Sequence, residues 1–189
     1  MKDLQKLSGR LKSIFHFLTY AIPLFIVFAW LFIEWPPINK IVRTGLFLRP
    51  EISTPEGLVD FSTRELPLLC KFIGCFGMLL GSLPTILGCA LLKKLFENYQ
   101  TRKIFLSSNT QIYKKIGWLA FIKGIFTIPV SQTLMVLAAT ISNPPGHRYI
   151  TLGFGTPNFE AILCGLIIVV ISLVMQEAQK LQEENQLTV

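Results

Sequence analysis

Four long apolar runs dominate this sequence and restrict its fold more than any other feature. The runs cover residues 14–35, 66–92, 116–141 and 159–175. A helix needs about 20 apolar residues to cross the hydrocarbon core of a bilayer, where lipid offers no hydrogen-bond partner to an open backbone. Each run approaches or exceeds this length. The sequence therefore predicts an all-α integral membrane protein with four transmembrane helices in a single domain, residues 1–189.

The composition supports this interpretation. The mean hydropathy is +0.53, and 51% of the residues are hydrophobic whereas only 15% are charged, too few to give a soluble 189-residue globule a polar surface. The first run is too long for a signal peptide, and no small-x-small cleavage site precedes Trp35-Pro36-Pro37. We therefore expect the first run to remain as a transmembrane helix.

Basic residues are distributed unequally over the segments that connect the runs. One side of the predicted membrane protein has eleven, namely Lys2, Lys6, Arg10, Lys12, Lys93, Lys94, Arg102, Lys103, Lys114, Lys115 and Lys180. The other side has five, namely Lys40, Arg43, Arg49, Arg64 and Arg148. Lys- and Arg-rich connections stay in the cytoplasm. Both termini and the connection 93–115 are therefore predicted inside, and the loops 36–65 and 142–158 outside. This asymmetry also explains the net charge of +7 without direct nucleic-acid binding.

Small residues recur on one face of three runs. The second run has Cys70, Gly74, Gly77, Gly81, Pro84 and Gly88, the third has Gly117, Ala120, Gly124, Thr127, Ser131 and Ala138, and the fourth has Ala161, Gly165 and Ser172. Steps of three and four residues keep such a set on one helical face, and in lipid small residues let two helix backbones approach closely. The first run is instead rich in Phe and Trp. We expect a tight bundle of helices two to four, with the first helix peripheral.

Polar residues follow a proline in the third run. Pro129 has no backbone N–H and frees the carbonyl of Ile125, and Ser131, Gln132 and Thr133 come directly after it. These side chains could line a ligand or ion site, or they could satisfy freed backbone groups and contact a neighbouring helix. The structural interpretation is favoured.

Two lysines and one glutamate in or beside the runs are candidates for a functional site. Lys71 and Lys123 fall inside apolar segments, and Glu160 stands at the outer start of the fourth run. An ionisable group within the membrane suggests a functional site, but both lysines lie near a surface and can extend their ammonium groups toward it. A contact between Lys71 and Glu160 is allowed by their predicted depth.

The sequence offers little chemistry for catalysis or metal binding. The four cysteines, Cys70, Cys75, Cys89 and Cys164, form no CxxC pair, and His16 and His147 are predicted on opposite sides of the membrane. Free thiols are favoured over a Cys70–Cys164 disulfide. No phosphate-binding loop or nucleophile motif occurs. We expect no metal, no cofactor and no enzymatic activity.

Two motifs resemble a known family. The first is Leu95-Phe96…Tyr99…Ile104-Phe105-Leu106-Ser107…Asn109 followed by Ile116-Gly117, and the second is the tail Leu181…Glu183-Glu184…Leu187-Thr188-Val189. From the second run to the C-terminus the chain resembles the bacterial membrane proteins grouped as domain of unknown function 2975. The resemblance implies a four-span protein of the bacterial inner membrane. It also implies a partner, because relatives are often encoded beside a small helix-turn-helix regulator. It implies no activity.

Two hypotheses for function follow. The first is a non-enzymatic sensory, regulatory or scaffold protein that signals to a cytoplasmic partner, with Glu183 and Glu184 as docking residues. The alternative is a small transporter or lipid-handling component with a polar site around Pro129–Thr133. Membrane lipids are expected contacts in either case, and a homo-oligomer is left open.

Overall fold

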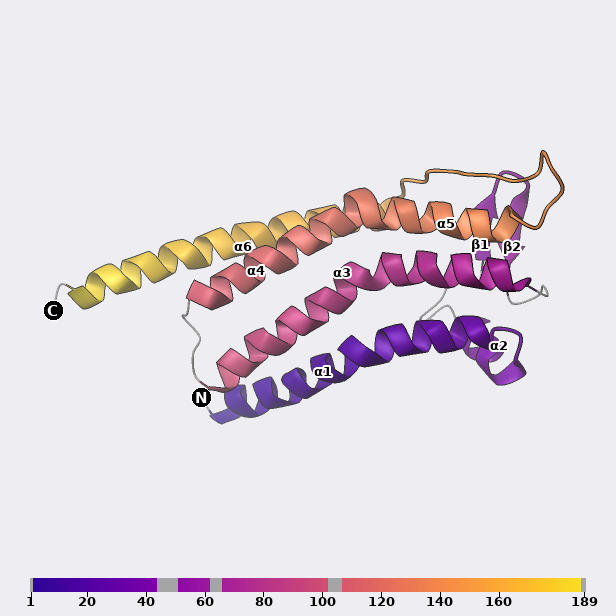
Figure 1. The fold of residues 1–189 in the computed structure, drawn as a ribbon. Helices are drawn as coiled ribbons and strands as arrows, with labels where there is room; N and C mark the ends of the chain where they lie inside the picture. Colours follow the sequence, from indigo (N-terminus) through magenta and orange to yellow (C-terminus); the bar gives the residue numbers. More distant parts are fainter. Residues whose placement is uncertain (1, 44–50, 62–65, 102–106, 188–189) are drawn as a thin grey trace. The chain divides into compact units, whose positions relative to one another are not determined.

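A computed structural model describes residues 2–43, 51–61, 66–101 and 107–187 of the chain (Figure 1). The elements are α1 (Lys2–Leu31), α2 (Pro36–Arg43), β1 (Glu51–Thr54), β2 (Gly57–Asp60), α3 (Leu68–Gln100), α4 (Ser107–Ile122), the π-helix η1 (Lys123–Thr127), α5 (Ile128–Thr140) and α6 (Thr156–Leu187). Four helical stretches are long and apolar enough to cross a membrane, and only 17–22% of their most apolar windows is buried. The described helices thus support the predicted all-α class with four spans, whereas the orientation and the arrangement of the spans stay predictions.

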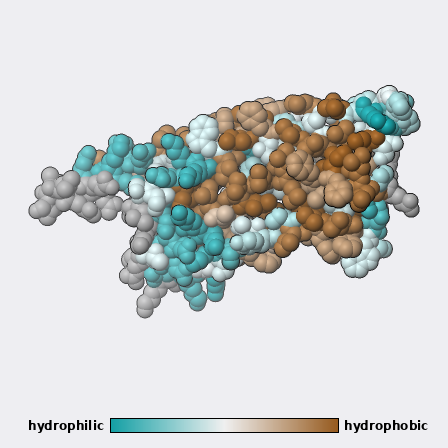
Figure 2. Space-filling view, viewed as in Figure 1, coloured by the Kyte–Doolittle hydropathy of each residue, from teal (hydrophilic) through white to brown (hydrophobic). Residues whose placement is uncertain are grey.

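The long helices extend beyond the apolar runs at their basic ends. α1 begins at Lys2, α3 continues to Gln100, α4 begins at Ser107 and α6 ends at Leu187. A helix satisfies its own backbone hydrogen bonds, so it can leave the hydrocarbon while its side chains change from apolar to charged. Figure 2 shows hydrophilic side chains gathered on these helix ends.

The chain divides into two compact units. Unit 1 comprises residues 1–21, 83–125 and 156–189, and unit 2 comprises residues 22–82 and 126–155. Each passage of the chain from one unit to the other lies within a few residues of a proline, namely Pro23, Pro84, Pro129 and Pro157. A proline inside a helix removes one backbone donor and locally weakens the helical ladder. In the third span this effect accompanies the π-turn Lys123–Thr127.

In unit 1, α4 packs side by side with α6 (Figure 1). Gly117 and Gly165 meet at the crossing, because a Cβ added at Gly165 would lie 2.7 Å from the Gly117 carbonyl oxygen and 2.6 Å from the Phe121 nitrogen. A Cβ added at Gly124 would lie 2.6 Å from the Asn158 carbonyl oxygen. The two backbones therefore touch at the positions occupied by small residues.

In unit 1, α1 is fastened to the end of α3. Lys12 Nζ donates to Glu97 Oε1 at 2.7 Å, and the rings of Phe15 and Phe96 stack with centroids 5.6 Å apart. Both pairs lie near the basic end of the two helices.

In unit 2, the core is built around α1. Its buried residues include Ile26, Ala29 and Trp30 of this helix and Ile33 in the turn after it, and Trp30 is 1% exposed. The indole fills the notch at Gly74, since a Cβ added there would lie 2.1 Å from a ring carbon. Within this unit the first helix therefore packs on α3 through Trp30, a contact that the sequence did not indicate, whereas its expected position outside the bundle stays a prediction.

Two further small residues of α3 face α5 in the same unit. A Cβ added at Gly77 would lie 2.8 Å from the Leu134 Cβ, and one at Gly81 would lie 2.5 Å from the Ser131 hydroxyl oxygen. Gly88 of unit 1 differs, because nothing lies within 4 Å of its added Cβ. The small-residue face of the second run is thus closely packed at Gly74, Gly77 and Gly81 but open at Gly88.

The predicted outer loop 36–65 contains elements that its sequence pattern did not indicate. Besides α2, it forms an antiparallel hairpin in which Glu51 pairs with Asp60 and Thr54 with Gly57. Gly57 has a φ of 123°, which a side chain would disfavour. Phe61, directly after β2, is 1% exposed and packs edge-on against Trp30 with centroids 5.3 Å apart. The hairpin is therefore anchored in the core of unit 2.

Candidate functional site

The segment 141–155 is built against α5 and returns along it toward its N-terminal end (Figure 1). The Tyr149 backbone N–H donates to Thr140 Oγ1 at 3.1 Å. Further along, the Thr133 hydroxyl lies 2.9 Å from the Thr151 carbonyl oxygen. The backbone of this segment thus finds polar partners on α5, as non-helical backbone beside a membrane helix requires.

Exposure alternates along the second half of this segment. Ile150, Leu152 and Phe154 are exposed, at 76%, 76% and 51%, whereas Thr151 and Gly153 between them are only partly exposed. A Cβ added at Gly153 would lie 2.9 Å from the Gln132 amide oxygen. Side chains of an extended chain alternate in direction, so the apolar ones point away from α5 and the small or polar ones toward it. The predicted loop 142–158 is therefore an ordered strap that ends where α6 begins, at Thr156.

The strap is tied to the hairpin by a polar cluster in unit 2. The Glu56 carboxylate, at the hairpin turn, contacts His147 Nδ1 and accepts a hydrogen bond from the Tyr149 hydroxyl at 2.9 Å. Arg148 Nε donates to the Asn143 carbonyl oxygen at 2.9 Å and closes the turn of the strap. Beside the cluster lies a cavity of about 390 Å³ lined by Thr54, Glu56, Gly57, Leu58, Val59, Asn143, Pro144 and His147.

The electrostatics of this cluster follow from its hydrogen bonds. The pKa of Glu56 is lowered from its ordinary value of 4.5, first by the hydrogen bond from His147 and then by that from Tyr149. The pKa of Tyr149 is raised from 10.0, mainly because its hydroxyl donates to this carboxylate. Ionised Glu56 and neutral Tyr149 are therefore the paired states.

We predict that the attachment of the hairpin to the strap weakens on acidification. A carboxyl group whose pKa is lower in the folded state stabilises the fold above pH 4.5, and this contribution is lost as pH falls through the folded-state pKa. Hydrogen exchange of the hairpin amides between pH 7 and pH 3, corrected for intrinsic exchange, should show protection lost at the acidic end. Glu56→Gln should already show the low protection at pH 7. Protection that is independent of pH in the native protein would contradict this assignment.

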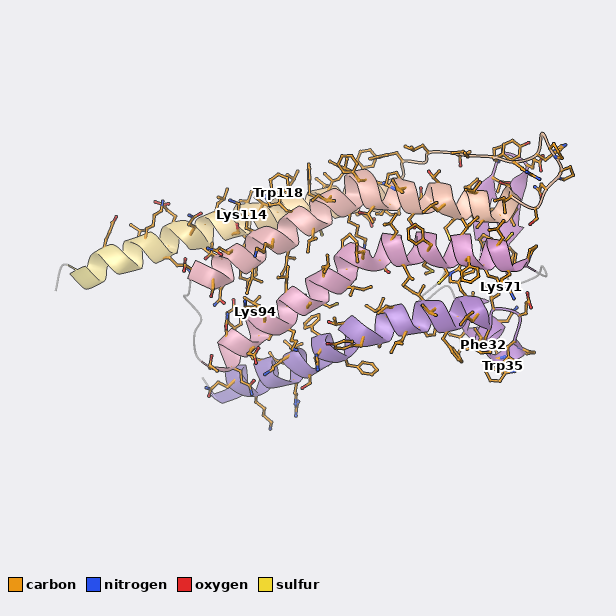
Figure 3. The ribbon with its side chains drawn as sticks, viewed as in Figure 1. Phe32, Trp35, Lys71, Lys94, Lys114 and Trp118 are labelled. Atoms are coloured by element: carbon orange, nitrogen blue, oxygen red, sulfur yellow. The ribbon has the colours of Figure 1, made fainter. Side chains whose placement is uncertain are left out.

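Lys71 forms an ion pair within unit 2. Its ammonium group lies 2.9 Å from Glu34 Oε1, and the same carboxylate oxygen accepts the Leu66 backbone N–H at 3.2 Å. Figure 3 shows Lys71 at the start of α3, near the turn that carries Phe32 and Trp35. The pair lies within unit 2, whereas Glu160 is exposed and belongs to unit 1, so the contact between Lys71 and Glu160 that the predicted depths allow stays a prediction.

Lys123 lies beside a second polar arrangement in unit 1. Its ammonium group donates to Thr85 Oγ1 at 2.9 Å. The neighbouring carbonyl of Gly124, in the π-turn, accepts the Asn158 amide N–H₂ at 2.8 Å. Asn158 is fully buried, so the first turn of α6 is fixed to the π-turn of the third span by a hydrogen bond shielded from water.

The polar residues after the third-span proline also contact the protein itself. Pro129 is buried in the first turn of α5. Ser131 Oγ donates to the Gly77 carbonyl oxygen at 2.7 Å, and the Thr133 hydroxyl lies 2.9 Å from the Pro129 carbonyl oxygen as well as from Thr151. These contacts connect α5 to α3 and to the strap, which favours the structural interpretation of Ser131 and Thr133.

The remaining candidates do not assemble into a site. Cys70, Cys75, Cys89 and Cys164 are free cysteines in the structure, and Cys70 Sγ contacts Ser142 Oγ at 3.0 Å. Within the described residues, no group of three His, Cys, Asp or Glu side chains is arranged to hold a metal ion. Glu184 is exposed on α6, and the side chain of Glu183 lies outside the described residues.

Sequence reasoning missed Glu34, Glu56 and Asn158 as partners. Glu34 precedes Trp35-Pro36 at the end of an apolar run, and Asn158 follows Thr156-Pro157 at the start of another. In the sequence, a polar residue at such a boundary indicates only that a helix begins or ends there. Only the complementary group, the ammonium of Lys71 or the π-turn carbonyl of Gly124, shows that the residue has a partner.

Comparison with known proteins places the chain in a family. The model of the family described as "Protein of unknown function (DUF2975)" matches residues 14–189. The match confirms the resemblance seen in the sequence motifs and extends it over the first span and the loop 36–65. Comparison with curated proteins gave no match, and comparison with solved structures gave none. The chain belongs to the DUF2975 family of multi-pass membrane proteins of unknown function.

Proposed function

We propose that this protein is a non-enzymatic regulatory protein of the bacterial inner membrane, with both termini in the cytoplasm. The observation that carries the proposal is the attachment of the hairpin to the strap through Glu56, His147 and Tyr149. The strap continues directly into α6. A change at this attachment would therefore act on the helix that carries the acidic tail.

In this proposal, the hairpin and the strap face outward and form the sensory part. The helix ends that extend beyond the apolar runs face the cytoplasm and form the part that a partner recognises. The unequal distribution of Lys and Arg supports this orientation. A small helix-turn-helix regulator is the proposed partner, on the grounds of the family resemblance, and Glu183 and Glu184 are the proposed docking residues.

A membrane two-hybrid assay with a small helix-turn-helix regulator, of the kind that the family resemblance implies, tests the proposal. The full-length chain should give a signal, which should fall at least tenfold in the double variant Glu183→Lys/Glu184→Lys. Lys180→Gln is the control, because it changes a charge on the same helix and should leave the signal unchanged. No signal with the native chain, or the same signal in the charge-reversal variant, would contradict the proposed docking.

The alternative, a transporter or lipid-handling component with a polar site at Pro129–Thr133, has less support. The hydroxyls of Ser131 and Thr133 hydrogen-bond to backbone carbonyls of the protein. Such a site would have to be accessible to water at mid-depth. A cysteine placed at Ser131 or Gln132 should be protected from a water-soluble maleimide if the regulatory proposal holds, and rapid labelling would favour the transporter.

A further inference from the structure

A groove separates α3 from α4 in unit 1, although polar contacts join the two helices near both of its ends. The contacts are Asn98 Nδ2 to Asn109 Oδ1 at 2.6 Å, the hydroxyls of Tyr99 and Tyr113 at 2.7 Å, and Lys123 Nζ to Thr85 Oγ1 at 2.9 Å. Between them lies a space of about 690 Å³. This volume is within the range of about 300–1,000 Å³ that is typical of small-molecule sites.

The lining of the groove is mostly apolar, and its polar residues lie at one end. α3 contributes Leu87, Ala90 and Leu91, and α4 contributes Gln111, Lys114, Lys115, Trp118, Leu119 and Ile122. The polar side chains all come from the first part of α4, whereas the deeper part of the lining is apolar. Figure 3 shows Lys114 and Trp118 on α4, one turn apart. The groove thus has a basic mouth and an apolar body.

The length of the groove matches one leaflet of a bilayer. From Gln111 to Ile122 the helix rises by about 16 Å at about 1.5 Å per residue. Half of a hydrocarbon core of about 30 Å is about 15 Å. Trp118 lies between the lysines and the apolar end, where an indole suits the boundary between headgroups and acyl chains. A ligand of this length would place a charged group at Lys114 and Lys115.

The groove is also open along the outer surface of the helices. Leu87, Trp118 and Ile122 are 45%, 48% and 43% exposed, so a ligand can enter from the lipid phase without a change in the helices.

We propose that this groove is a binding site for one anionic phospholipid. One acyl chain lies against Leu87, Leu91 and Ile122, and the phosphate lies at the ammonium groups of Lys114 and Lys115. Lys93 and Lys94 follow Leu91 by less than one turn of α3 and add positive charge at the same level. Basic pockets between transmembrane helices select anionic headgroups by this charge complementarity. The proposal stands independently of the regulatory role.

Native mass spectrometry of the full chain tests the site. The protein would be delipidated in detergent and titrated with phosphatidylglycerol or, separately, with phosphatidylcholine. We expect one phosphatidylglycerol to be retained more tightly than phosphatidylcholine. In Lys114→Gln/Lys115→Gln this preference should fall by about 25-fold, at about fivefold for each lysine near an anionic headgroup. The charge-matched control Lys40→Gln/Lys180→Gln changes two lysines that do not line the groove and should keep the preference.

A second variant tests the apolar body of the groove. Leu87→Trp adds bulk to the lining without changing charge and should reduce retention of the phosphatidylglycerol while the lysines remain. Equal retention of the two lipids by the native protein, or a preference that survives the double lysine variant, would overturn the proposal. So would efficient disulfide crosslinking of two chains through Trp118→Cys in lipid-rich membranes, because a second copy would then occupy the groove.

Discussion

Replacing Gly165 with alanine is expected to destabilise the packing of α4 against α6 by about 1–3 kcal/mol, the usual cost of overpacking a close contact. The added Cβ would lie 2.6 Å from the Phe121 nitrogen and 2.7 Å from the Gly117 carbonyl oxygen. Both are backbone atoms, so no side chain can rotate away and the two helices have to separate. The free energy of unfolding in mixed detergent micelles measures this loss.

Gly88→Ala is the matched control for this substitution. It is the same chemical change in the middle of a long apolar helix, but the new Cβ would meet nothing within 4 Å. Its stability should be unchanged or rise by up to about 1 kcal/mol, because alanine is the better helix former. Gly81→Ala should lie between the two, since its closest contact is the Ser131 hydroxyl oxygen, which can rotate. Equal losses at Gly165 and Gly88 would contradict the assigned crossing.

Replacing Trp30 with alanine is expected to cost about 3–5 kcal/mol, as is typical when a buried large aromatic residue is truncated. The indole is 1% exposed, fills the notch at Gly74 and contacts Phe61. Its loss would leave a cavity where α1, α3 and the end of the hairpin meet in unit 2. Detergent-induced unfolding, followed by far-UV circular dichroism, gives the change in stability.

The control for Trp30 is Phe17→Ala on the same helix. Phe17 is 70% exposed, so its ring is in a position to contact lipid in the native state as well as after unfolding, and its removal should change stability little. Trp30→Phe should lose less than Trp30→Ala, because a ring remains in the notch. A loss at Phe17 as large as that at Trp30 would support the peripheral first helix expected from the sequence and contradict the core of unit 2.

The transmembrane helices could be predicted from the sequence because each one depends only on the residues of its own segment. Lipid cannot satisfy a backbone amide, so each span appears as one uninterrupted apolar run. The small residues at Gly74, Gly117 and Gly165 were recognised for a similar reason, since helical periodicity places them on one face. What periodicity cannot identify is the partner of that face. Trp30 is the example, because an aromatic residue in an apolar run is equally compatible with lipid and with a notch.

The candidate polar sites were harder to predict because they depend on distant residues. Lys71 was identified as an unusual charge, but Glu34 is far from it in sequence. The strap along α5 depends on the hydroxyls of Thr133 and Thr140, and no hydrophobic pattern indicates that 141–155 returns along that helix. The hairpin is held by Phe61 in the core of unit 2, a contact that only the tertiary structure shows.

The orientation of the chain in the membrane is the central claim, and labelling of single cysteines in intact cells tests it most directly. With the four native cysteines replaced by alanine, Pro145→Cys marks the strap and Lys180→Cys marks the end of α6. An impermeant maleimide that reaches the periplasm should label Pro145→Cys in intact cells, and Lys180→Cys only after the inner membrane is opened. Labelling of Lys180→Cys in intact cells, with Pro145→Cys protected, would contradict the orientation and the regulatory proposal built on it.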